Sequence, residues 1–108
     1  MTFDEYQKES RKTATYIGKQ DFWYPALGLA GETGEVVEKI KKLFRDDNGV
    51  MSESRRTDLQ NELGDVLWYI SQIATDSGIS FEKIASGNLE KIFSRKDRGK
   101  IKGDGDNR

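Results

Sequence analysis

The sequence predicts an all-α protein, and three observations support this fold class. Apolar residues recur at helical spacing in several segments, helix-breaking or capping residues separate these segments, and no run alternates with the period of a β-strand. The chain has 108 residues, which indicates one domain. Because only 34% of the residues are hydrophobic and 34% are charged, we expect helix packing between subunits to supplement a modest core.

The first helix is expected over residues 3–17, since Thr2 and Glu5 have the spacing of a capping box. Residues 18–24 are expected to form a connector. Pro25 suits the first turn of a second helix, which extends to about residue 45 before the strong breaker DDNG.

A third and a fourth helix follow, each preceded by a serine. Ser52 can cap a helix that extends to about residue 77, where Gly78 is a C-terminal stop. Ser80 can cap the last helix, over residues 81–96. We therefore expect one helical domain at residues 1–96, followed by a Gly-rich, charged tail at 97–108 whose composition predicts disorder.

Composition excludes several classes of function. The net charge of −1 provides no basic field for nucleic acid or for an anionic membrane. No apolar run approaches a membrane span and the N-terminus lacks the layout of a signal peptide, so we expect a soluble cytoplasmic protein. The chain has no Cys and no His, so carboxylates must supply any acid–base groups or metal ligands.

The two central helices contain a short internal repeat. With an offset of 30 residues, LAGETGEVVEKI aligns with LQNELGDVLWYI in the pattern L-x-x-E-x-G-[ED]-V-x-x-x-I. Glu32 therefore matches Glu62, and Glu35 matches Asp65. At about 100° per residue, each acidic pair lies on the same side of the apolar stripe of its helix.

Folding the two helices as an antiparallel hairpin places the acidic pairs level with each other. All four carboxylates should then converge on one rim, where bound hard cations such as Mg²⁺, Mn²⁺ or Ca²⁺ relieve their repulsion. The alternative is an ordinary solvated helix face, on which Glu35–Lys39 and Glu38–Lys42 form i,i+4 pairs.

Two glycines, Gly34 and Gly64, are also related by the repeat. A glycine inside a helix costs about 0.5–1 kcal/mol relative to alanine. We interpret them as room for another helix, from the same chain or from a second subunit, although simple tolerance is an alternative.

The stretch GLAGETGEVVEKIKK followed by NELGDVLWYI resembles the MazG-type all-α nucleoside triphosphate pyrophosphohydrolases. The family hallmark is ExxE, a spacer and ExxD, which here are Glu32-x-x-Glu35 and Glu62-x-x-Asp65. NLEKIFSRKDRG is similar to the N-x-x-K-x-x-x-R segment of the family, and GKIKGDGDNR is similar to the endings of small phage-like and actinobacterial members. The resemblance spans roughly residues 25–108.

The resemblance implies a four-helix bundle with an antiparallel central hairpin, assembled as a homodimer or homotetramer. It also implies Mg²⁺-dependent hydrolysis of (deoxy)nucleoside triphosphates to monophosphate and pyrophosphate, as nucleotide-pool house-cleaning, with Mn²⁺ as a substitute. Carried over residue by residue, the metal ligands would be Glu32, Glu35, Glu62 and Asp65, and phosphate or sugar contacts would come from Asn88, Lys91 and Arg95.

The expected chemistry is metal-assisted attack of water on the α-phosphorus. Lys39 and Lys42 share the acidic side of their helix and are candidates for contact with pyrophosphate, against a role in surface salt bridges. Tyr69 lies between Glu62 and Asp65 in angle, so it is a candidate for substrate contact.

The group that activates water has two candidates. Some family members carry a second acid just before the first motif Glu, but here that position is Gly31. The candidates are therefore Glu38 and a metal-bound hydroxide that needs no separate base.

Two other functions stay open at this point. One is a phosphoribosyl-ATP pyrophosphohydrolase, which shares the acidic helical layout. The other is a non-catalytic helical interaction or regulatory protein, for which we expect no stabilisation by divalent cations. If the chain is a triphosphate hydrolase, the tail is expected to order over the bound substrate.

Overall fold

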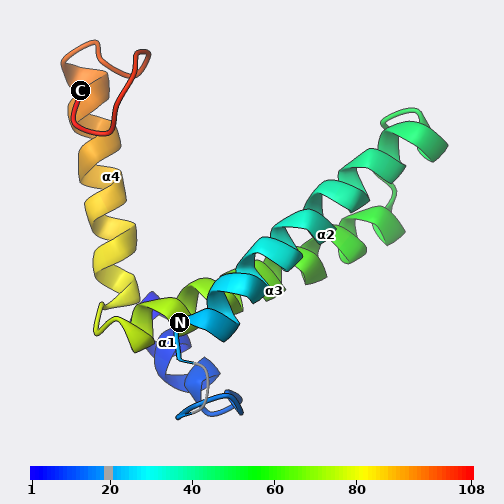
Figure 1. Cartoon of the computed structure of the whole chain (residues 1–108). Helices are drawn as coiled ribbons and strands as arrows, with labels where there is room; N and C mark the ends of the chain where they lie inside the picture. Colours follow the sequence, from blue (N-terminus) through cyan, green and yellow to red (C-terminus); the bar gives the residue numbers. More distant parts are fainter. Residues whose placement is uncertain (19–20) are drawn as a thin grey trace.

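The computed structural model describes residues 1–18 and 21–108, and within them the chain is all-α with four helices (Figure 1). The helices are α1 (Phe3–Arg11), α2 (Trp23–Asp47), α3 (Glu53–Asp76) and α4 (Phe81–Asp97). The fold class and the antiparallel central hairpin, formed by α2 and α3, are confirmed. Within the described residues, no helix is both long and apolar enough to cross a membrane.

The helix ends follow the predicted caps. Thr2, Ser52 and Ser80 each accept a hydrogen bond from the backbone N–H three residues further on, at 3.1–3.2 Å. The end of α2 is set by Asn48 and Gly49, which both have positive φ and so turn the chain into α3. The ends of α2, α3 and α4 lie within about two residues of the predicted ones.

The predicted end of α1 was wrong, because the helix stops at Arg11 rather than near residue 17. After α1 the Thr13 hydroxyl donates to the Ser10 carbonyl oxygen at 2.7 Å and accepts from Trp68 Nε1 at 2.8 Å. Such side-chain hydrogen bonds compete with the backbone hydrogen bonds that would continue the helix.

A buried carboxylate, Asp76, fixes the connector that follows. The Asp76 side chain is 1% exposed and pairs with Arg11 at 2.8 Å. It also accepts hydrogen bonds from the Tyr16 hydroxyl at 2.7 Å and from the Phe22 N–H at 3.1 Å. Burial and the bond to Asp76 raise the pKa of Tyr16 to about 12. Residues 19–20 of the predicted connector lie outside the described residues.

The direction of α4 is set by reciprocal capping with α1. The Glu82 carboxylate accepts the Phe3 N–H at 2.9 Å, and the Asp4 carboxylate accepts the Glu82 N–H at 3.1 Å. The rings of Phe3 and Phe81 stack at 4.7 Å between centroids. Because these contacts lie at the start of α4, the rest of that helix extends away from the hairpin.

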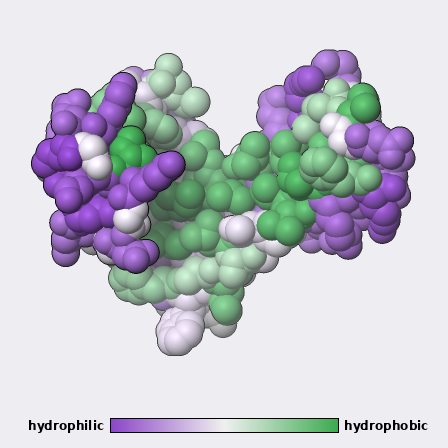
Figure 2. Space-filling model, turned by 90° about the horizontal axis from the view of Figure 1, so that it is seen from above, coloured by the Kyte–Doolittle hydropathy of each residue, from purple (hydrophilic) through white to green (hydrophobic). Residues whose placement is uncertain are grey.

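The chain has two arms that meet near α1, one formed by the α2–α3 hairpin and one by α4 (Figure 1). α4 packs against α1 and α3 but not against α2. The radius of gyration is 16.7 Å, whereas a compact domain of about 100 residues has about 13 Å. The surface between the two arms is mainly apolar (Figure 2). Large apolar side chains are exposed on both arms, and Phe44 of α2 and Phe93 of α4 are 66% and 56% exposed.

The C-terminal loop, which we define as residues 98–108, folds back against α4 (Figure 1), although composition predicted disorder there. The Arg108 guanidinium donates to the carbonyl oxygens of Lys100, Ile101 and Gly105. These bonds close the loop on itself.

A candidate metal and nucleotide site

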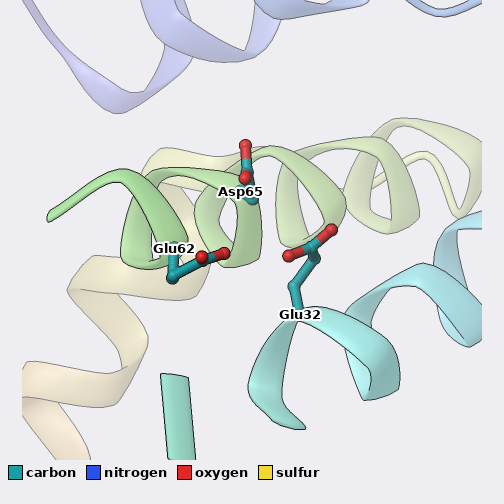
Figure 3. A group of neighbouring side chains, drawn as sticks. All are labelled: Glu32, Glu62 and Asp65. Carbon is teal, nitrogen blue, oxygen red and sulfur yellow. The ribbon is translucent and has the colours of Figure 1, made fainter. Parts of the chain in front are cut away.

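Three carboxylates meet on one rim of the α2–α3 hairpin. Glu32 comes from α2 and Glu62 and Asp65 from α3, and one oxygen of each lies within 4.8 Å of the others (Figure 3). Glu32 and Glu62 are half-buried and Asp65 is exposed. We call these residues the acidic cluster.

The predicted fourth member, Glu35, is exposed and lies outside the acidic cluster, so the structure brings together three of the four carboxylates. Its charge nevertheless acts on the cluster. Burial raises the pKa of Glu32, and the nearby charges of Asp65, Glu62 and Glu35 raise it further. A group whose charged form is disfavoured in this way gains from a neighbouring cation.

The turn between α2 and α3 keeps the acidic residues of the two helices level with each other. Arg55 at the start of α3 pairs with Asp47 at 2.6 Å and with Asp46 at 3.7 Å, both at the end of α2. Leu43, near the end of α2, is buried at 6% exposure. The short turn with its ion pairs therefore keeps the level placement that the repeat predicts.

The candidate lysines on α2 have different surroundings. Lys39 Nζ lies 3.5 Å from the Glu62 carboxylate, on the edge of the acidic cluster. Lys42 lies 3.6 Å from Glu38, which also pairs with Lys41 at 2.9 Å. The hydrogen bond from Lys41 and the charges of both lysines lower the pKa of Glu38, which makes it a weaker base.

Tyr69 lies one helical turn from Asp65 and contacts α2 at Gly28. A Cβ built at Gly28 would lie 2.1 Å from Tyr69 Cε1, so only glycine leaves room for this ring. The Tyr24 ring lies beside it, with centroids 6.2 Å apart. Burial raises the pKa of Tyr69, with contributions from Tyr24 and from the charges of Glu32 and Asp65. The sequence shows a glycine one turn before Glu32, but only the structure reveals its partner.

Gly34 and Gly64 do not make room for a helix of the same chain. A Cβ at either position would meet no atom of the described residues within 4 Å. Close approach by a second subunit stays a prediction.

We expect Gly28→Ala to destabilise the chain by about 1–3 kcal/mol, because the new methyl group overlaps the Tyr69 ring. Gly31→Ala is the matched control on the same helix, since a Cβ there meets nothing within 4 Å. The control should gain up to about 1 kcal/mol from helix propensity. Urea unfolding measures both, and equal stabilities of the two variants would contradict the placement of Tyr69.

Asn88, Lys91 and Arg95 do not join the acidic cluster within one chain. All three lie on α4, which extends away from the hairpin and does not pack against α2 (Figure 1). Lys91 and Arg95 instead pair with Asp106 of the C-terminal loop, at 2.9 Å and 3.1 Å. Asn88 is exposed.

A small apolar hollow of about 130 Å³ lies between the N-terminus, α1 and Leu67 of α3, the helix that carries Glu62 and Asp65. The Asp65 charge reaches one of its lining residues, since burial and then this charge raise the pKa of Tyr6. A larger hollow, of about 580 Å³, lies between α1 and the α3–α4 turn, and no residue of the acidic cluster lines it. The small hollow is lined by Met1, Thr2, Phe3, Tyr6 and Leu67.

Comparison with known proteins shows the family of the chain and a similar phage protein. The family model described as the MazG nucleotide pyrophosphohydrolase domain matches residues 25–99, which include the whole acidic cluster. The Gene 37 protein of Mycobacterium phage L5 is 45% identical over 114 aligned positions, which cover 100% of both chains. No solved structure matches the chain.

Proposed function

Because the chain belongs to the MazG nucleotide pyrophosphohydrolase domain family, we propose that it hydrolyses nucleoside triphosphates to monophosphate and pyrophosphate with the help of divalent cations. The observation that supports this most is the convergence of three carboxylates inside the matched region. In this proposal water attacks the α-phosphorus and pyrophosphate leaves.

The donor set of the acidic cluster fits a hard cation. Oxygen ligands suit Mg²⁺, Mn²⁺ and Ca²⁺, and the chain contains no Cys or His that would favour a softer metal. We assign Glu32, Glu62 and Asp65 to hold the ion, with Glu35 one turn along α2 as the fourth carboxylate. A bound cation would neutralise charge on the phosphate oxygens and lower the pKa of a bound water.

The residues of the chain itself have two further roles in this proposal. Lys39 now pairs with Glu62, and a cation on Glu62 would release its ammonium group for a phosphate oxygen. Glu38 is left out of proton transfer, because its pairs with Lys41 and Lys42 lower its pKa. Lys42 is left as a second candidate for contact with pyrophosphate.

Two apolar surfaces of the chain are candidates for contact with the nucleoside. Tyr69 presents its ring one turn from Asp65, and the hollow beside Tyr6 adds a small apolar pocket. Ligand pockets combine such apolar walls with a few polar groups. We propose these two surfaces for the sugar and the base.

We also propose that the protein works as a homodimer or homotetramer. The basic residues of α4 and the acidic cluster lie on separate arms, so one chain does not supply both to one substrate. The surface between the arms is apolar and many large apolar side chains are exposed, and burying them against a second copy would enlarge the hydrophobic core (Figure 2). Light scattering gives the mass in solution.

The function is tested by measuring pyrophosphate release from the common ribo- and deoxynucleoside triphosphates and from phosphoribosyl-ATP. Release from at least one common triphosphate with Mg²⁺ or Mn²⁺, lost on chelation, is the expected result. Activity on phosphoribosyl-ATP alone would instead favour the sibling enzyme. A chain inactive on the whole panel would favour the non-catalytic alternative.

Divalent cations should also stabilise the folded chain without any substrate. A cation that binds only the folded state adds about 2.7 kcal/mol at 100 times its Kd. A thermal melt with Mn²⁺ should therefore show a clearly higher Tm than a melt with a chelator. An unchanged Tm at millimolar Mn²⁺ would contradict metal binding by the acidic cluster.

A further inference from the structure

Two basic side chains on α4 converge on a single anionic oxygen. Lys91 Nζ and Arg95 Nη2 lie 2.9 Å and 3.1 Å from Oδ1 of Asp106. Arg95 Nη2 also donates to the backbone carbonyl oxygen of Asp106. The spacing of four residues puts both cations on the same face of α4, one turn apart.

The Arg95 guanidinium is buried, the Lys91 side chain is 39% exposed, and Asp106 is the most exposed of the three. Arg95 is 8% exposed, but the Asp106 side chain is 79% exposed. Both bonds from Arg95 to Asp106 use Nη2, and its buried Nε has no hydrogen-bond partner among the described residues, 1–18 and 21–108. A buried N–H without an acceptor is costly, so this guanidinium has unused capacity for an oxyanion.

The C-terminal loop is shaped to carry Asp106 back to α4. Gly103 and Gly105 both have positive φ, at 131° and 83°, which side chains other than glycine adopt at a cost. Arg108 closes the loop through three carbonyl oxygens. The loop therefore brings a carboxylate to the two cations by its own backbone geometry.

In the proposed function Lys91 and Arg95 contact a phosphate group of the substrate, and we propose that Asp106 is a displaceable occupant of this site. A phosphate group has more oxygens and more charge than a carboxylate, and it can accept from Nε and Nη2 of one guanidinium together. This inference rests on the proposed function for its substrate, since the phosphate would belong to the nucleotide or to the pyrophosphate product. The loop would then restrain activity at low nucleotide concentration, because binding must first displace Asp106.

The first test measures binding of inorganic pyrophosphate to the full chain by calorimetry, without divalent cations and at low salt. We expect Asp106→Asn to tighten binding roughly three- to tenfold, because the variant removes the competing charge. Asp104→Asn is the matched control, since Asp104 lies in the same loop and contacts neither cation. Lys91→Gln should weaken binding at least roughly tenfold.

The outcomes separate the possible roles of Asp106. Equal affinities of the two Asn variants would overturn the proposal, and Asp106 would then only hold the C-terminal loop against α4. Weaker binding by Asp106→Asn would also overturn it, since the loop would then help to hold the ligand. Because the measurement needs no hydrolysis, failure of the proposed enzyme activity would not be mistaken for failure of this site.

Limited proteolysis with trypsin gives an independent measurement on the unmodified chain. Pyrophosphate should accelerate cleavage after Lys100 and Lys102, because displacing Asp106 releases the loop. Slower cleavage is the result expected if the loop orders over its ligand, and it would overturn displacement. Cleavage at an unchanged rate under saturating pyrophosphate would overturn it as well.

Discussion

Asp65→Asn should lower kcat for triphosphate hydrolysis by at least roughly 100-fold, which is close to 3 kcal/mol of transition-state stabilisation. The asparagine keeps the shape of the side chain but removes one of the three charges of the acidic cluster. Removal of the Asp65 charge also relieves its repulsion of Glu32, so the metal-free protein should be at least as stable as the unsubstituted chain. Steady-state kinetics with Mg²⁺ and a urea titration without it measure both effects.

Asp58→Asn is the matched control, because Asp58 lies on α3 outside the acidic cluster and its substitution changes the net charge by the same amount. This variant should keep nearly full activity. Full activity in Asp65→Asn would show that the acidic cluster does not hold the catalytic cation. Equal losses in both variants would attribute the effect to overall charge.

Asp76→Ala should destabilise the fold by about 3–5 kcal/mol, which is the usual cost of removing one partner of a buried ion pair. The truncation leaves Arg11 without its charge partner, and the Tyr16 hydroxyl and Phe22 N–H without their acceptor. Urea unfolding followed by circular dichroism measures the change. Asp104→Ala, at an exposed residue of the C-terminal loop, is the surface control and should change stability by less than about 0.5 kcal/mol.

The same carboxylate should make the protein sensitive to acid. Burial alone raises the pKa of Asp76, but hydrogen bonds from Tyr16, Phe22 and Arg11 outweigh burial and lower it. A group with a lowered folded pKa contributes stability above its unfolded pKa, about 3.9 for Asp, and loses it as pH falls through the folded value. The stability difference between the unsubstituted chain and Asp76→Ala should therefore shrink below about pH 4. A constant difference down to pH 2 would contradict this role.

The central hairpin and the acidic cluster could be predicted because their causes are local or periodic. The repeat, the helical angle and a short turn together place Glu32 level with Asp65. The serine caps can be recognised from the residue type before each helix. Glu35 departs from the prediction because helix geometry fixes where its Cβ lies but not the rotamer of a long exposed side chain.

The C-terminal end of α1 and the direction of α4 could not be predicted, because residues distant in sequence decide them. α1 stops early as the chain turns to bring Tyr16 to Asp76, 60 residues away. The direction of α4 depends on capping between Glu82 and Phe3. Sequence periodicity does not indicate such pairs of distant residues. The packing of the Tyr69 ring against Gly28 could not be predicted for the same reason.

The central claim is that water attacks the α-phosphorus of a nucleoside triphosphate at this acidic site, and hydrolysis in H₂¹⁸O tests it most directly. With Mg²⁺ or Mn²⁺ and a triphosphate from the panel, mass spectrometry of the products should find ¹⁸O in the nucleoside monophosphate and unlabelled pyrophosphate. Label in pyrophosphate, or release of orthophosphate with a nucleoside diphosphate, would contradict the account.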